Sequence, residues 1–184
     1  RYPSVTPIRG DFYTVAMPGQ FDAVCMFETF GMGSDADQRR LLQKIATQWL
    51  APGGVVILDV YHPFGPIRQA GTAQALDRLE NVAGSVAMTE HSYYDVVLGR
   101  WIDEWEPVGD NAATRRQSIR CYTPADLLLL LEGTGLNIIH AEFAGRAFDP
   151  DPREITTMSP LHDYESDYAY TVILTAKSTP STDR

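Results

Sequence analysis

The sequence predicts an α/β domain in which a mostly parallel sheet is interrupted by an antiparallel β insertion. Two nearly continuous apolar runs, at residues 21–27 and 55–60, are typical of strands that are buried on both faces of a parallel sheet. An amphipathic helical pattern lies between these runs, so strand, helix and strand predict a right-handed βαβ unit. From residue 85 to residue 122, in contrast, apolar and polar residues alternate, which favours antiparallel strands with one exposed face.

The helix of the βαβ unit has clear start and stop signals. Ser34 is a suitable N-cap, and Asp37 follows at the spacing of a capping box. The helix must end before Pro52, because a residue that precedes proline is disfavoured in the α conformation. Its buried face is expected to consist of apolar residues at helical spacing: Leu41, Leu42, Ile45, Ala46, Trp49 and Leu50.

The middle of the chain, residues 63–122, is predicted to form the insertion. Near its start, Ala75, Leu76 and Leu79 favour a short helix. Beyond residue 85 we expect three antiparallel strands, because the alternating segments there are separated by turns that contain glycine.

The last third of the chain returns to the α/β pattern. Thr123, Pro124 and Asp126 combine an N-cap, a proline in the first helical turn and an acidic capping partner. A leucine-rich helix follows them, and the segments 136–143 and 168–176 are expected to form a closing antiparallel hairpin.

The whole chain, residues 1–184, is interpreted as a single domain. Residues 1–62 and 123–177 form its α/β core, and residues 178–184 form a polar tail. The long acidic loop between the last two strands matches no metal-ligand spacing, so no metal site is predicted.

Charge and composition restrict the function classes. The chain contains 15 Lys and Arg against 24 Asp and Glu, a net charge of −9, which disfavours nucleic acids and anionic membranes as partners. No apolar run approaches the ~20 residues that cross a bilayer. Two isolated cysteines, Cys25 and Cys121, indicate neither a disulfide framework nor a zinc site, so a cytoplasmic location is expected.

Four segments resemble, in order, the class I S-adenosylmethionine (SAM)-dependent methyltransferase family. Residues 10–12, Gly-Asp-Phe, resemble the loop that meets the adenine in that family. Residues 21–31 resemble its fourth strand with the cofactor-facing end of that strand, and residues 50–59 resemble the turn into its fifth strand. Residues 122–136 resemble its late helix and the turn into its final hairpin. The resemblance covers most of the chain except the insertion.

This resemblance implies a Rossmann-like methyltransferase fold that ends in an antiparallel hairpin, with SAM as cofactor and S-adenosylhomocysteine as product. It also implies methyl transfer to a small-molecule substrate by in-line displacement, as in family members that act on amino sugars and other natural products. The insertion would then cover the substrate or form the interface of a homodimer.

The family's first strand and its Gly-rich cofactor loop have no counterpart in this sequence, which contains no G-x-G-x-G motif. We therefore expect that the N-terminal part of the methyltransferase domain is missing from the chain. The alternative is a non-catalytic, methyltransferase-like protein that lacks the cofactor loop and serves as a binding or assembly partner.

The resemblance assigns cofactor binding to two places at the carboxyl ends of the predicted strands. Asp11 would accept a hydrogen bond from the adenine amino group and Phe12 would stack on the ring, whereas a turn residue and a core aromatic are the alternatives. Phe27, Glu28 and Thr29 would lie near the reactive end of the cofactor. For Glu28, an ordinary solvated loop carboxylate is the alternative.

A catalytic base is needed only if the nucleophile carries a proton at neutral pH, and three residues are candidates for it: Glu28, His62 and His91. His62 directly follows the second buried strand, and its alternative is a turn residue fixed by Pro63. His91 lies in the insertion, which usually covers the substrate in this family. The alternative for His91 is a surface residue that is paired across two strands.

Trp101 and Trp105 occupy alternate positions of one predicted insertion strand and therefore share a face. Packing in the core of the insertion is the preferred interpretation of this pair. An aromatic substrate pocket and a dimer interface are the alternatives.

Overall fold

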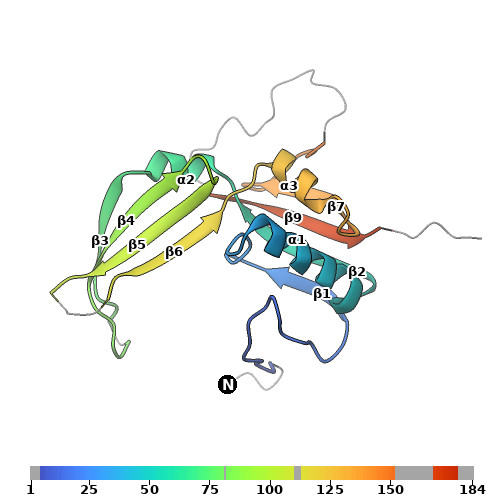
Figure 1. Cartoon of the computed structure of the whole chain (residues 1–184), viewed down its shortest axis with the longest axis horizontal. Helices are drawn as coiled ribbons and strands as arrows, with labels where there is room; N and C mark the ends of the chain where they lie inside the picture. Colours follow the sequence, from blue (N-terminus) through green and yellow to red (C-terminus); the bar gives the residue numbers. More distant parts are fainter. Residues whose placement is uncertain (1–4, 81, 110–112, 152–167, 178–184) are drawn as a thin grey trace, which may run out of the picture.

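The computed structural model describes residues 5–80, 82–109, 113–151 and 168–177. These residues form a five-stranded sheet with the order β1-β2-β9-β7-β8, here called the core sheet, and a four-stranded sheet with the order β3-β4-β5-β6, here called the insertion sheet. Figure 1 shows the insertion sheet to the left of the core sheet, with helices α1 and α3 beside the core strands.

The core elements come from two blocks of the chain that flank the insertion. The first block consists of β1 (Phe21–Met26), α1 (Asp35–Lys44), the π-helical segment η1 (Ile45–Trp49) and β2 (Leu50–Tyr61). The second block consists of α3 (Pro124–Leu131), β7 (Leu136–Phe143), β8 (Arg146–Ala147) and β9 (Ala169–Ala176). The insertion between them consists of α2 (Phe64–Gln69), β3 (Thr72–Leu76), β4 (Met88–Asp95), β5 (Arg100–Pro107) and β6 (Arg115–Arg120).

Two predicted segments lie outside the described residues. They are the polar tail at residues 178–184 and most of the long acidic loop. Of the helices in the described part of the chain, none is long and apolar enough to cross a membrane.

The core sheet is mixed. β1 and β2 are the parallel pair of the predicted βαβ unit, with Cys25 opposite Ile57 and Met26 opposite Leu58. The pairings of β2 with β9, of β9 with β7 and of β7 with β8 are antiparallel. The described strands therefore contain less parallel pairing than the expected mostly parallel sheet. The reason is that the last strand, β9, enters between β2 and β7 in the opposite direction, as the closing hairpin requires.

Both predicted capping boxes are confirmed. At the start of α1, the Asp37 N–H donates to Ser34 Oγ at 3.2 Å, and the Ser34 N–H donates to Asp37 Oδ2 at 2.9 Å. At the start of α3, the Asp126 N–H donates to Thr123 Oγ1 at 3.1 Å, and the Thr123 N–H donates to Asp126 Oδ2 at 3.0 Å. Each box satisfies N–H groups that would otherwise lack a partner in the first helical turn.

One face of the core sheet forms the hydrophobic core. On β2, Val56, Leu58 and Val60 are fully buried in one cluster with side chains of α1, η1 and α3. Burying such an aliphatic side chain contributes roughly 1.5–3 kcal/mol. The intervening residues of β2 are only half-buried, so one face of the sheet is covered more completely than the other.

The insertion agrees with its prediction beyond residue 85 and differs from it before that point. The three antiparallel strands expected beyond residue 85 are confirmed as β4, β5 and β6. The short helix favoured by Ala75, Leu76 and Leu79 is wrong, since Ala75 and Leu76 belong to a fourth strand, β3. The reason is non-local: β3 pairs with β4, with Leu76 opposite Met88, and this pairing overrides a weak local preference. The helix of this region, α2, precedes β3 in the chain.

Candidate functional site

The carboxyl ends of β1 and β2 lie at the same edge of the core sheet, because the two strands are parallel. Phe27 and Glu28 follow β1 at this edge, and Tyr61 is the last residue of β2. Ligands of open α/β sheets bind beyond such carboxyl ends. The insertion sheet reaches the same edge, where the ring of Trp101 on β5 meets the ring of Tyr61 with a centroid distance of 5.3 Å.

The loop that follows β1 is held against the insertion sheet. Gly31 has φ 103°, and a Cβ at this position would lie 2.4 Å from the carbonyl oxygen of Arg120, so a larger residue does not fit. The Arg120 N–H donates to the Gly31 carbonyl at 2.8 Å. The Arg100 guanidinium donates to the carbonyl groups of Gly31, Met32 and Gly33 at 3.2, 3.1 and 3.0 Å, respectively. Glu28, with φ 56°, remains exposed at the start of this fixed loop.

A groove of about 460 Å³ separates β1 from the segment that precedes it. This volume lies in the range of roughly 300–1,000 Å³ that is typical of small-molecule sites. Phe12 and Thr29 both line it, so the structure brings two of the predicted cofactor residues together. None of the described lining residues is charged: Thr6, Ile8, Gly10, Phe12, Val15, Met17, Phe21, Ala23, Val24, Cys25, Met26, Thr29, Leu41 and Trp49.

Asp11 is not among the described residues that line this groove. Its Oδ1 accepts a hydrogen bond from the Tyr13 N–H at 2.8 Å, and its carbonyl accepts one from the Val15 N–H at 2.7 Å, which forms a tight turn. Asp11 instead lines a separate pocket, which is also lined by Lys44. Asp11 thus stands apart from Phe12, although the two are neighbours in the sequence.

His62 directly follows β2 and is buried, with 4 % of its surface exposed. Its ring stacks on Phe64 at a centroid distance of 5.2 Å and meets Tyr170 at 6.3 Å, while its Nδ1 accepts a hydrogen bond from the Phe64 N–H at 3.2 Å. Burial lowers the pKa of His62 to about 4, although the negative charge of Asp126 opposes this shift. The imidazole is therefore neutral at neutral pH.

His91 lies on the face of the insertion sheet that is opposite to Trp101. In the register of β4 and β5, Tyr94 pairs with Trp101 and His91 pairs with Glu104. Successive residues of a strand point to opposite faces, so these two pairs lie on different sides of the sheet. The Nε2 of His91 lies 3.7 Å from Glu106 Oε2. The structure thus does not bring His91 to the contact between Trp101 and the core sheet.

Sequence reasoning missed an aromatic cluster at this edge, which consists of Tyr61, Trp101 and Tyr168. The Trp101 ring stacks on Tyr168 at a centroid distance of 5.7 Å and meets Tyr61 edge-on. The Trp101 Nε1–H donates to Ser92 Oγ at 3.4 Å, and the Ser92 hydroxyl donates to the Asp103 carboxylate. The signal available in the sequence was the alternation that places Trp101 on one face of its strand. The two tyrosines that contact Trp101 come from distant parts of the sequence, so no local pattern links them to it.

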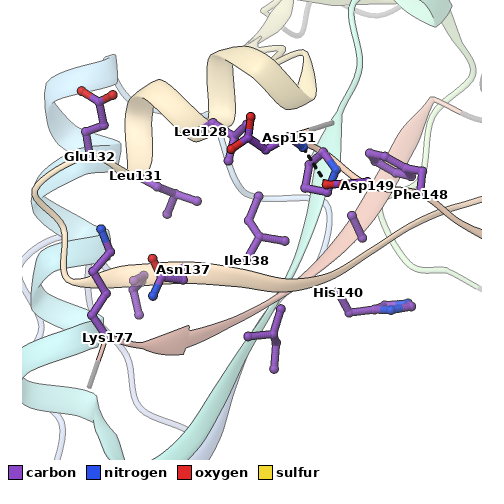
Figure 2. A pocket seen from close by; sticks show the side chains of 14 residues that line it. Leu128, Leu131, Glu132, Asn137, Ile138, His140, Phe148, Asp149, Asp151 and Lys177 are labelled. Carbon is purple, nitrogen blue, oxygen red and sulfur yellow. Dashed lines mark hydrogen bonds between the residues drawn. The ribbon is translucent and has the colours of Figure 1, made fainter. Parts of the chain in front are cut away.

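A second cavity, of about 580 Å³, lies between α3, β7 and the segment that begins at Phe148 (Figure 2). Asn137, His140 and Asp149 are among its lining residues, and Asp149 Oδ1 accepts a hydrogen bond from the Asp151 N–H at 2.9 Å. In the core sheet, β9 separates β7 from β2, so this cavity is remote from the edge where β1 and β2 end together. In the described part of the chain, no group of His, Cys, Asp and Glu side chains is arranged to hold a metal ion.

Solved structures of similar fold include several methyltransferases. The structure of the CcbJ methyltransferase from Streptomyces caelestis has a TM-score of 0.66 at 18 % identity and covers 94 % of this chain and 64 % of that protein. A SAM-dependent methyltransferase from Clostridium acetobutylicum has a TM-score of 0.62 at 11 % identity, with 92 % and 63 % covered. CalS10, an amino pentose methyltransferase from Micromonospora echinaspora, has a TM-score of 0.56 at 19 % identity, with 96 % and 66 % covered.

The sequence itself matches no protein-family model and no curated protein. The chain spans just under two thirds of the length of each of these three structural relatives. The structural likeness shows that the chain has the Rossmann-like α/β fold of the class I SAM-dependent methyltransferases, as the ordered motif segments imply.

Proposed function

We propose that this chain takes part in SAM-dependent methyl transfer to a small-molecule substrate. The observation that supports this most is that β1 and β2 end at one edge of the sheet in a fold that methyltransferases use, while a groove of small-molecule size runs along β1 as far as Thr29. The insertion sheet reaches the same edge through Trp101, as expected for a segment that covers a substrate. A relative of similar fold, CalS10, is described as an amino pentose methyltransferase, which supports a small molecule as the substrate.

The groove beside β1 fits the apolar part of SAM. Phe12 and Met26 offer apolar walls for a planar base, and Thr29 contributes a hydroxyl group. We assign cofactor binding to Phe12 and Thr29, which line the groove, and to Phe27, which directly follows β1. We assign a turn-forming role to Asp11, whose carboxylate accepts a backbone hydrogen bond. When bound, SAM supplies an electrophilic methyl group, whose transfer breaks a carbon–sulfur bond and leaves the electron pair on sulfur.

Glu28 is the proposed base or ammonium ligand at this edge. Its carboxylate is exposed, and its charge acts on Tyr61, where it adds to the effect of burial in raising the pKa of the tyrosine hydroxyl. A base at this place would take the proton that the substrate's nucleophile loses. We place Glu28 ahead of His62 and His91, because one imidazole is buried and the other lies on the far face of the insertion sheet.

Calorimetric titration of the purified protein with S-adenosylhomocysteine tests this proposal. We expect saturable binding that Phe12→Ala weakens by about tenfold or more, because the substitution removes an aromatic wall of the groove. Phe148→Ala is the matched control, since Phe148 lines the remote cavity beside β7 instead. The proposal fails if no saturable binding is seen or if both variants lose affinity equally.

A non-catalytic binding protein with a methyltransferase-like fold is the second candidate. It is favoured by the lack of any charged residue in the described lining of the groove, because the ribose hydroxyls and the amino acid end of SAM are polar. This candidate predicts that S-adenosylhomocysteine produces no heat of binding in the same titration.

We further propose that core and insertion form one domain, that the protein is cytoplasmic and that two copies form a homodimer. The one-domain proposal is supported by the contacts of Arg100 with the loop after β1 and by the ion pair of Arg120 Nε with Asp35 Oδ1 at 3.3 Å. Tyr93, which is 44 % exposed on the insertion sheet, suits an interface between two copies. Sedimentation equilibrium distinguishes a dimer from a monomer of 20.5 kDa.

A further inference from the structure

A buried carboxylate without a cationic partner lies next to the aromatic cluster. Asp103 is 8 % exposed, and Ser92, which donates its hydroxyl hydrogen to it, is 6 % exposed. None of the ion pairs found among the described residues includes Asp103. A carboxylate that is removed from water without a cation costs free energy of folding, so its place in the fold calls for a function.

The arginines of the insertion sheet do not neutralise Asp103. Arg100 donates to the loop after β1, and Arg116 Nε lies 3.3 Å from Glu104 Oε1 on the opposite face of the sheet. Arg115 shares the face of Asp103, but it is exposed and is one register pair further along β5 on that face. No ion pair among the described residues therefore neutralises the negative charge of Asp103.

The aromatic cluster is linked to this carboxylate by hydrogen bonds, and Trp101 and Asp103 share one face of β5. The indole N–H of Trp101 and the hydroxyl of Ser92 form a short hydrogen-bonded chain that ends on Asp103. The three rings of Tyr61, Trp101 and Tyr168 are only half-buried, so part of their surface reaches solvent. Aromatic faces attract cations through their quadrupole, and the attraction is strongest for Trp.

Carboxylates from three separate elements act electrostatically on the hydroxyl group of Tyr61. Burial raises the pKa of its hydroxyl most, and the charges of Glu28, Asp59 and Asp103 raise it further. These carboxylates come from the loop after β1, from β2 and from β5, so the charges that raise the pKa of Tyr61 belong to three separate elements. Negative charges favour a cationic ligand over a neutral one of the same shape.

We propose that the substrate is an amine whose ammonium group binds at the aromatic cluster, with Asp103 and Glu28 supplying the opposite charge. This inference rests on the proposed function, because it assigns a substrate class to the same edge. Asp103 is buried, and a dielectric lower than that of water strengthens its attraction for a cation. An ammonium nitrogen has no lone pair, so the bound nitrogen must lose a proton before it can itself accept a methyl group.

The first test uses tetramethylammonium chloride as a probe of charge and shape, without SAM and at constant ionic strength. We expect a saturable shift of the indole N–H resonance of Trp101 in a titration followed by nuclear magnetic resonance. tert-Butanol, a neutral molecule of similar shape, should cause no comparable shift at the same concentrations. The proposal is overturned if the two molecules act alike or if the resonance does not respond.

The second test compares two substitutions on opposite faces of β5. Asp103→Asn should weaken binding of tetramethylammonium by at least about tenfold, whereas Glu104→Gln should leave it within about twofold. Unchanged binding in a folded Asp103→Asn variant, or equal losses in both variants, contradicts the proposal. If Asp103→Asn does not fold, the comparison of cation and alcohol on the unaltered protein still decides the question.

Methyl transfer as the function and an amine as the substrate are contradicted by different results. Binding of S-adenosylhomocysteine without binding of the cation overturns the amine as substrate and leaves methyl transfer in place. Binding of neither overturns both, because the cation titration contains no cofactor and the calorimetric titration contains no amine.

Discussion

The core sheet and the insertion sheet use their buried positions differently. In the core sheet, the fully buried residues of β2 are aliphatic, namely Val56, Leu58 and Val60. In the described strands of the insertion sheet, the buried positions are Ser92, Asp103 and Ile119, and only the last of these is apolar.

This difference separates stability from chemistry. Apolar burial is non-directional and supplies most of the free energy of folding, so the core sheet holds the molecule together. A buried serine and carboxylate contribute little net stability and need specific partners, and our proposal assigns those of the insertion sheet to ligand recognition. The edge where the two sheets meet combines both, because Tyr61 ends a core strand and its ring meets Trp101 of the insertion.

The largest expected effect on the free energy of unfolding comes from truncating a residue of the core sheet, and a truncation in the insertion sheet serves as the comparison. Leu58→Ala should lower the free energy of unfolding by about 3 kcal/mol, because Leu58 is fully buried and truncation leaves a cavity. Ile102→Ala, at a half-buried position of β5, should cost only about 1 kcal/mol. Urea unfolding followed by circular dichroism gives both values. Equal losses would contradict the view that the core sheet carries the stability.

The junction between the sheets is tested by comparing Gly31, in the loop after β1, with Gly53, which lies in β2 and also has a positive φ. Gly31→Ala should cost about 2–3 kcal/mol, because its Cβ would meet the Arg120 carbonyl oxygen at 2.4 Å in addition to the backbone strain. Gly53→Ala meets nothing within 4 Å and should cost about 1 kcal/mol through its backbone conformation alone. The same unfolding experiment measures both. A smaller loss at Gly31 than at Gly53 would mean that the loop after β1 is not fixed to the insertion.

The buried imidazole of His62 predicts a pH dependence. The pKa of His62 is about 4 in the folded protein against 6.5 for the free side chain, so the unfolded chain binds a proton first as the pH falls. Stability should therefore decrease between pH 6.5 and pH 4, by roughly 3 kcal/mol, and this group should contribute no slope above that window.

A matched pair of variants isolates this effect. His62→Gln should flatten the decrease of stability with falling pH, whereas His140→Gln, at an exposed position of β7, should leave it intact. The measurement is the free energy of unfolding at several pH values between 4 and 7. An unchanged slope in His62→Gln would show that other groups cause the dependence.

The smallest expected effect concerns the helix that follows the insertion. Thr123→Ala removes the side-chain acceptor for the Asp126 N–H and should cost about 1 kcal/mol. Thr123→Ser retains a hydroxyl at the cap and should restore most of the loss. Thermal unfolding of the two variants provides the check, and equal destabilisation by both would mean that the cap is not the cause.

Local signals in the sequence predicted local structure well. The capping boxes at Ser34 and Thr123 depend on residues that stand three positions apart, so the chain itself contains the whole interaction. Strand β3 could not be predicted in this way, because its conformation depends on pairing with β4, where Thr72 lies opposite Ser92.

The candidate site could likewise be predicted only where its residues are marked by local signals in the sequence. Glu28 and Thr29 could be placed at a strand end from the buried run before them, and Phe12 from its motif. The contact of Tyr61 with Trp101 depends on how two sheets approach each other, and neither periodicity nor a motif contains that information.

The most direct test of methyl transfer as the function is to locate S-adenosylhomocysteine on the purified protein by backbone amide shifts. The proposed function predicts saturable shifts at Phe12, Phe27 and Thr29, which flank the edge where β1 and β2 end. Shifts confined to the other cavity, at Asn137 and His140 beside β7, would contradict it, and so would a spectrum that the ligand leaves unchanged.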